Sequence, residues 1–131
     1  MPKKRSRYPT ELELEILKVL WKSAPMTVRE VRESMGGKGR ELAHTSLITT
    51  LNVMFDKGQV SRTEAGRGYA FSPLVSHEAV SRGMVGDLVQ RVFDGSSSAL
   101  ILSLLENESP DPAEHEALRE AIDGWRKEQK P

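Results

Sequence analysis

The chain has 131 residues, of which 29% are charged and 37% hydrophobic, and it carries nineteen Lys/Arg and nineteen Asp/Glu. This length suits one ordinary domain or a small domain with an appendage, and the absence of cysteine excludes a disulfide framework and a thiolate metal site. No apolar run follows the basic N-terminus and none approaches a membrane span, so we expect a cytoplasmic protein with no secretory signal and no membrane insertion.

The zero net charge conceals an uneven distribution. Residues 1–75 contain thirteen Lys/Arg and eight Asp/Glu, a net of +5, whereas residues 76–131 contain six and eleven, a net of −5. Such asymmetry is typical of a part that faces a polyanion joined to an acidic companion. A binding surface for nucleic acid is therefore expected in the first half.

Residues 1–9 form a basic N-terminal arm that contains four Lys/Arg and ends at Pro9. One interpretation is a solvated tail. The other is an arm that contacts phosphates or the minor groove only when DNA is bound.

Two helices are predicted next, at residues 10–23 and 27–35. Each opens with a capping box, a threonine followed three residues later by glutamate, and each has an apolar stripe at helical spacing. The boxes are Thr10 with Glu13 and Thr27 with Glu30, and the stripes are Leu12, Ile16, Val19 and Leu20, then Val28, Val31 and Met35.

The glycine-rich stretch Gly36–Gly39 ends the second helix. It lacks the spacing and the following Ser/Thr of a nucleotide-binding phosphate loop. We expect a flexible connection in which Lys38, together with Arg40 just after it, meets the DNA phosphate backbone.

A third helix is predicted at residues 41–57, with Leu47, Leu51, Met54 and Phe55 on one face. Short polar side chains mark the opposite face, although such residues are mediocre helix formers. Hydroxyl and amide groups on an exposed helix suit a DNA groove, where they reach phosphates, base edges and thymine methyls; a surface helix that tolerates threonine is the alternative. The candidates are His44, Thr45, Ser46, Thr49, Thr50 and Asn52.

The segment after this helix reads as a hairpin, with strands at residues 59–63 and 68–72 around a turn at 64–67. Arg62 and Arg67 place positive charge on or beside the turn. A helix followed by a basic-tipped hairpin is the layout of a winged helix-turn-helix, which we expect to span residues 10–75. Protein–protein contact is the alternative use of such a module, and the charge of the first half favours DNA.

The second half, residues 76–131, is predicted to be a helical module of three helices. The first has a stripe of residues spaced by four, the second is apolar nearly all round, and the third begins at Asp111 and Pro112. A unit this small is marginal alone, so a second copy of the chain is the expected partner. The expected dimerisation residues are Leu88, Val92, Leu100, Ile101, Leu104, Leu105, Ile122 and Trp125.

A catalytic or metal site is not expected. His44, His77 and His115 lie far apart in the sequence. His77-Glu78 begins like the helix motif of a zinc protease, but Ser81 stands where the second histidine belongs. We therefore predict neither enzyme activity nor a cofactor.

Five segments resemble the BlaI/MecI penicillinase-repressor family, which includes copper-responsive repressors. They are "TELELEILKVLW" (Thr10–Trp21), "TVREV" (Thr27–Val31), "ELAHTSLITTLNVMFDKGQVSR" (Glu41–Arg62), "GRGYAFSPLVS" (Gly66–Ser76) and "LILSLLENE" (Leu100–Glu108). The resemblance implies a mainly α fold, with an N-terminal winged helix-turn-helix and a C-terminal dimerisation domain. It also implies a dimeric transcriptional repressor on a dyad-symmetric operator, with a helix face matching Ala43, Ser46 and Thr49 against double-stranded DNA.

Two features of the family bear on regulation. Its copper-responsive members end in a paired-cysteine motif, whereas this chain has no cysteine. In its antibiotic-resistance members a membrane sensor protease triggers cleavage at an Asn-Phe bond in the helix corresponding to Leu100–Glu108. The bond in the matching position joins Ser103 to Leu104.

Overall fold

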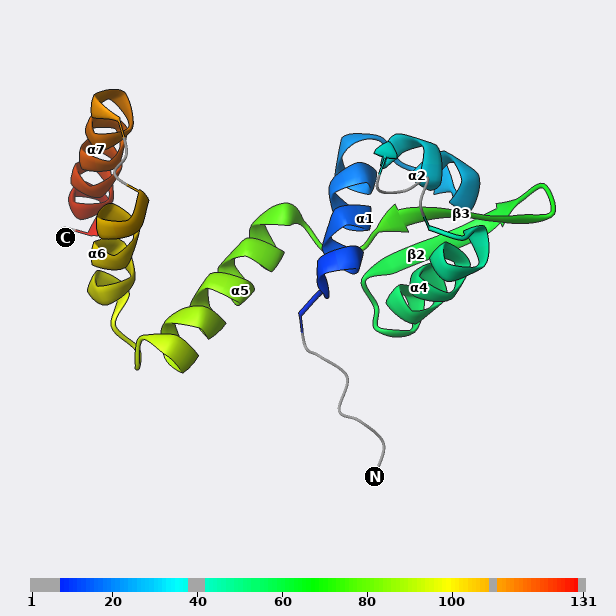
Figure 1. Ribbon diagram of the computed structural model, residues 1–131, viewed down its shortest axis with the longest axis horizontal. Helices are drawn as coiled ribbons and strands as arrows, with labels where there is room; N and C mark the ends of the chain where they lie inside the picture. Colours follow the sequence, from blue (N-terminus) through cyan, green and yellow to red (C-terminus); the bar gives the residue numbers. More distant parts are fainter. Residues whose placement is uncertain (1–7, 38–41, 109–110, 130–131) are drawn as a thin grey trace. The chain divides into compact units, whose positions relative to one another are not determined.

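A computed structural model describes residues 8–37, 42–108 and 111–129 of the chain (Figure 1). The chain divides into two compact units, Met1–Val85 and Gly86–Pro131. The described residues form six helices and one three-stranded sheet. The mainly α fold class is therefore confirmed, and each unit is described below by itself.

The first unit opens with the two predicted helices, α1 (Glu11–Lys22) and α2 (Val28–Ser34). Both begin at the predicted capping boxes, which supply partners to backbone N–H groups that a helix start leaves unpaired. In the first box the Glu13 N–H donates to Thr10 Oγ1 at 3.2 Å, and the Thr10 N–H donates to Glu13 Oε1 at 2.9 Å.

The sheet consists of β1 (Met26–Thr27), β2 (Val60–Ala65) and β3 (Gly68–Pro73) in the order β1-β3-β2, with antiparallel pairing. The predicted hairpin is confirmed, but its turn is two residues long rather than four. Strand pairing continues to Ala65 opposite Gly68, and Gly66 takes a φ of 62°. Glycine at this position allows the tight turn that matches the twist of two paired strands.

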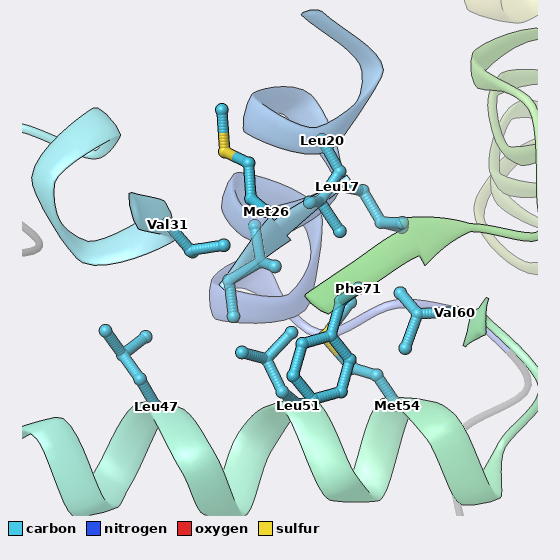
Figure 2. Packing of buried hydrophobic residues seen from close by; sticks show 10 residues of the cluster. Leu17, Leu20, Met26, Val31, Leu47, Leu51, Met54, Val60 and Phe71 are labelled. Carbon is cyan, nitrogen blue, oxygen red and sulfur yellow. The ribbon is translucent and has the colours of Figure 1, made fainter. Parts of the chain in front are cut away.

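The core of the first unit lies between α1, α2, α4 (His44–Asp56) and the sheet. Figure 2 shows Leu47, Leu51 and Met54 pointing from α4 into this core. They occupy positions i, i+4 and i+7, so they share one side of the helix. The buried cluster comprises Ile16, Leu17, Leu20, Met26, Val31, Leu47, Leu51, Met54, Val60 and Phe71.

Phe55 does not lie in this core, contrary to the sequence prediction. Its side chain is 36% exposed, and Met54 fills the core position beside it. The residue at i+8 lies about 80° around the helix from the residue at i, so it reaches the edge of the apolar face. There Phe55 meets the hairpin instead.

A buried ion pair joins α1 to the C-terminal end of α4. Lys57 Nζ lies 2.8 Å from Glu13 Oε1, and the two side chains are only 10% and 4% exposed. Burial acts to raise the pKa of Glu13, but hydrogen bonds from Lys57, the Thr10 backbone and Gln59, with the charge of Lys57, hold that pKa below its ordinary 4.5. The carboxylate is therefore ionised at neutral pH and fixes the end of α4.

The start of α5 (His77–Val92) is fastened to α1 within the same unit. Trp21 Nε1 donates to the Val75 carbonyl oxygen at 2.9 Å, and the Trp21 ring meets the His77 ring edge-on at 5.1 Å between centroids. Val80, one turn further along α5, is buried. This contact ties the segment after the hairpin back to the core.

The second unit holds the end of α5, α6 (Ser97–Glu108) and α7 (Pro112–Gln129). The chain turns between α5 and α6, where Asp94 and Gly95 adopt φ values of 48° and 85°. Asp111 Oδ1 caps α7 by accepting from the Glu114 N–H at 2.9 Å. Val89 is the unit's one buried apolar side chain among the residues described.

Replacing Lys57 by Met leaves Glu13 buried without its counter-charge. We expect this change to lower the free energy of unfolding at pH 7 by about 3–5 kcal/mol. Arg29→Met is the control, because Arg29 pairs with Glu33 at 3.3 Å where the side chains are 83% and 65% exposed. Loss of such a surface pair costs about 0–1 kcal/mol. Urea unfolding followed by circular dichroism measures both, and equal losses would contradict the role given to Glu13.

The same ion pair predicts a pH dependence. The folded protein lowers the pKa of Glu13 below its ordinary value of 4.5. The stabilisation that the ion pair gives the fold is therefore present above pH 4.5, and it is lost as the pH falls through the folded pKa. In Lys57→Met the penalty disappears as Glu13 becomes protonated. The stability difference between the wild type and Lys57→Met should therefore narrow on acidification.

Candidate nucleic-acid interface

One side of α4 faces outward because the other side is held in the core by Leu47 and Leu51. The outward residues at its start and middle are short and polar, or alanine. We call this surface the reading face; it comprises Ala43, His44, Thr45, Ser46 and Thr49, all exposed. The predicted candidates Thr50 and Asn52 are half-buried at its margin.

The threonine hydroxyls of α4 are bonded to the helix itself. Thr49 Oγ1 donates to the Thr45 carbonyl oxygen at 2.9 Å, and Thr50 Oγ1 donates to the Ser46 carbonyl oxygen at 2.8 Å. These bonds explain how threonine is accommodated within a helix. The hydroxyl oxygen of Thr49 can still accept a hydrogen bond, for example from the amino group of adenine or cytosine. Its γ-methyl can contact the methyl group of thymine.

The hairpin formed by β2 and β3, which we call the wing, is attached to α4 through Arg62. Arg62 Nη1 donates to Asn52 Oδ1 at 3.0 Å. The guanidinium carbon also lies 4.0 Å from the ring centroid of Phe55 and 4.6 Å from that of Tyr69. The predicted candidates Asn52 and Arg62 are therefore brought together, whereas Arg67 lies exposed in the turn at the far end of the wing.

A groove of about 520 Å³ separates the wing from α4 and the start of α2. From α4 it is lined by a row at i, i+4 and i+8, namely His44, Ile48 and Asn52. Ile48 was not predicted as a surface residue. In the sequence Ile48 stands among the polar residues of the outward face. Because it follows Leu47, it is easily assigned to the apolar stripe instead. The other lining residues are Thr27, Val28, Arg29, Arg62, Ala65, Arg67, Gly68, Tyr69 and Phe71.

Two of the predicted phosphate contacts, Lys38 and Arg40, lie outside the described residues, as do residues 1–7 of the basic arm.

Among the residues described, no group of three or more His, Asp or Glu side chains is placed to hold a metal ion. No helix in the described ranges is long and apolar enough to cross a membrane. The surface described above is the outward side of a helix beside a hairpin, an arrangement suited to contact with a groove of DNA.

The predicted dimerisation residues lie on α5, α6 and α7. Six have exposed side chains and two, Leu100 and Leu105, are half-buried. Between α6 and α7 lies a groove of about 620 Å³. Its lining combines apolar residues, among them Ile101, Ile122 and Trp125, with the polar or charged residues His115, Glu116, Arg119 and Asp123. The bond between Ser103 and Leu104 lies inside α6.

The sequence model of the penicillinase repressor family matches residues 9–124 of the chain. The transcriptional regulator BlaI of Mycobacterium tuberculosis, from strains CDC 1551 and H37Rv, is 29% identical over 114 residues, 86% of this chain and 80% of that protein. The penicillinase repressor of Bacillus licheniformis is 23% identical over 99 residues, 76% of this chain and 77% of that protein. A MarR family protein from Bacillus stearothermophilus, whose structure is known, aligns with 91% of this chain and 74% of its own at 19% identity and a TM-score of 0.46.

Thr49→Ala should leave folding unchanged, because Thr49 is exposed and alanine is the better helix former. We expect it to weaken binding to a preferred duplex by about 1–3 kcal/mol and to affect other sequences unequally. Thr49→Val keeps the γ-methyl and Thr49→Ser keeps the hydroxyl, so the two variants divide the loss between these groups. Titration of preferred and random duplexes measures the ratio of the two affinities. An unchanged ratio in Thr49→Ala would mean that Thr49 does not read bases.

Proposed function

The chain belongs to the penicillinase repressor family, and we propose that it represses transcription in the cytoplasm as a homodimer bound to a dyad-symmetric DNA operator. Its family makes it a transcriptional regulator rather than an enzyme. The winged helix-turn-helix fold supports the DNA-binding part of this proposal. The observation that carries it is the outward reading face of α4 beside a wing whose turn holds an exposed arginine.

The reading face fits the major groove of DNA. An α-helix enters that groove, which is about 12 Å wide, and only side chains on its outward side reach base edges. Ser46 and Thr49 lie one turn apart on this side and have short stems. Since the opposite side of α4 is anchored in the core, their positions are fixed before DNA binds.

The wing supplies contact with the DNA backbone. Arg67 is exposed at the turn, away from the core, where a guanidinium can bind a phosphate without disturbing the fold. Lys38, Arg40 and the arm at residues 1–9 are proposed to add phosphate contacts. These contacts give affinity that is independent of sequence, whereas the reading face gives preference among sequences.

Two copies of the chain are needed to cover a dyad-symmetric site, because one reading face covers a half-site. The apolar side chains on α6 and α7 support the C-terminal half, residues 76–131, as the dimerisation module. Ile122 is 45% exposed and Trp125 is 61% exposed, and contiguous exposed apolar surface marks an interaction site. A two-fold dimer would bury the same face of each copy.

Cleavage within this module would release the operator. Cutting between Ser103 and Leu104 would divide α6 and separate α7 from the DNA-reading half of the chain. The dimer would then lose the surfaces that link its two reading faces. A membrane sensor protease is the partner proposed for this step, on the family resemblance.

Ile122→Lys should break the proposed dimer without harming the first unit. Glu120→Lys is the matched control, because it also places a lysine on α7, at an exposed position 200° around the helix from Leu118 and outside the groove residues. We expect Ile122→Lys to be monomeric and to lose affinity for the full palindrome by a factor on the order of 10²–10⁴. Its affinity for a duplex that carries one half-site should match that of the wild type.

Sedimentation combined with operator titration makes this comparison. If Ile122→Lys stays dimeric, or binds the palindrome as tightly as Glu120→Lys does, the C-terminal module does not join the two copies in this way. If the wild type prefers no duplex over another, the proposed function itself is wrong.

A further inference from the structure

We propose that Arg62 is a positioning residue, which fastens the wing to α4 and so sets the spacing between the two elements that contact DNA. This inference deepens the proposed function and rests on it. Arg62 acts together with Asn52, Phe55 and Tyr69, a group that we call the wing clamp. The proposal removes Asn52 and Arg62 from the residues that contact DNA directly.

The strand register places Arg62 on the side of the sheet that faces α4. Arg62 on β2 pairs with Phe71 on β3, and cross-strand partners point to the same side of a sheet. Phe71 is buried in the core. Tyr69 lies two residues before Phe71, so it shares this side and is a diagonal neighbour of Arg62. The direction of Arg62 is therefore a consequence of β-pairing.

The guanidinium group of Arg62 is already engaged by side chains of both elements. On α4 it donates to Asn52 Oδ1 at 3.0 Å and lies 4.0 Å from the Phe55 ring centroid. On the wing it lies 4.6 Å from the Tyr69 ring centroid. A planar cation combines a directed hydrogen bond with attraction to aromatic faces, and lysine does not reproduce that combination.

The wing clamp explains why Phe55 lies outside the core. Its ring lies under the guanidinium group of Arg62, at the edge of the apolar side of α4. Asn52 and Phe55 are three residues apart on α4, so both reach the same part of the wing. Val60 and Phe71 hold the base of the hairpin in the core, and Arg62, two residues beyond Val60, adds an attachment to α4.

A fixed wing direction matters for specificity. The reading face and Arg67 must reach bases and phosphate at the same time, and their separation depends on the angle between α4 and the wing. Loosening the clamp would weaken binding most on the preferred duplex, where both contacts are required. Random duplexes, which are held by charge, would be affected less.

The test compares lysine and alanine at Arg62 and at Arg67. Arg62→Lys keeps the charge but loses the stacking geometry and the planar fork. We expect its preference for the operator over random duplex to fall about tenfold, equivalent to about 1.4 kcal/mol, with an unchanged slope of log affinity against log salt. Arg67→Lys should keep both the preference and the slope, whereas Arg67→Ala should lower the slope by about one unit.

The contradicting result is also specific. If Arg62→Lys behaves like the wild type and Arg62→Ala lowers the salt slope as Arg67→Ala does, Arg62 binds phosphate and is not a positioning residue. Tyr69→Ala provides a second route, since it loosens the clamp without changing any charge. Tyr69→Ala should lower the preference for the operator over random duplex, as Arg62→Lys does. Tyr69→Phe keeps the ring and should keep the wild-type preference.

Hydrogen exchange in the absence of DNA tests the clamp separately from the proposed function. Arg62→Lys and Tyr69→Ala should both raise amide exchange in β2 and β3, while exchange in α1 stays unchanged. Unchanged protection of the wing would overturn the clamp even if the chain binds DNA. If the wild type prefers no duplex while the wing loosens as expected, the proposed function fails and the clamp stands as a structural link.

Discussion

Burial of one side of α4 is the constraint on which the first unit depends. Leu47, Leu51 and Met54 pack against α1, α2 and the sheet, so the direction of the helix is fixed by the apolar core (Figure 2). The ion pair between Lys57 and Glu13 fixes the C-terminal end of the same helix. Since both attachments lie on the inner side, the reading face is not needed to hold the helix in place. Short polar residues there cost little stability, and they reach bases from a rigid platform.

The basic residues of the first half serve different purposes, although all of them are positively charged. Lys57 is buried and stabilises the core through Glu13. Arg62 lies between the wing and α4, and Arg67 is exposed at the turn. Counting positive charges therefore overstates the number of phosphate contacts. Burial and hydrogen-bond partners separate structural cations from those available to DNA.

Much of the fold was predictable from local patterns, because capping boxes and apolar spacing of three to four residues act within one element. The boxes at Thr10 and Thr27 and the stripe on α4 illustrate this. What could not be predicted depends on contacts between distant segments. The two-residue strand β1 exists only through pairing with β3, and Phe55 leaves the core because Arg62 and the wing meet it. Likewise, the sequence marked Asn52 and Arg62 as separate candidates, and only the fold brings them together.

A hydroxyl-radical footprint on duplexes that the intact chain selects from a random pool tests the central claim most directly. A dimer with two outward reading faces should select a dyad-symmetric sequence. It should protect two segments on one side of the duplex, with centres about 10 base pairs or a multiple of that distance apart. Selection of a single unrepeated half-site, or protection without any preferred sequence, would contradict the account.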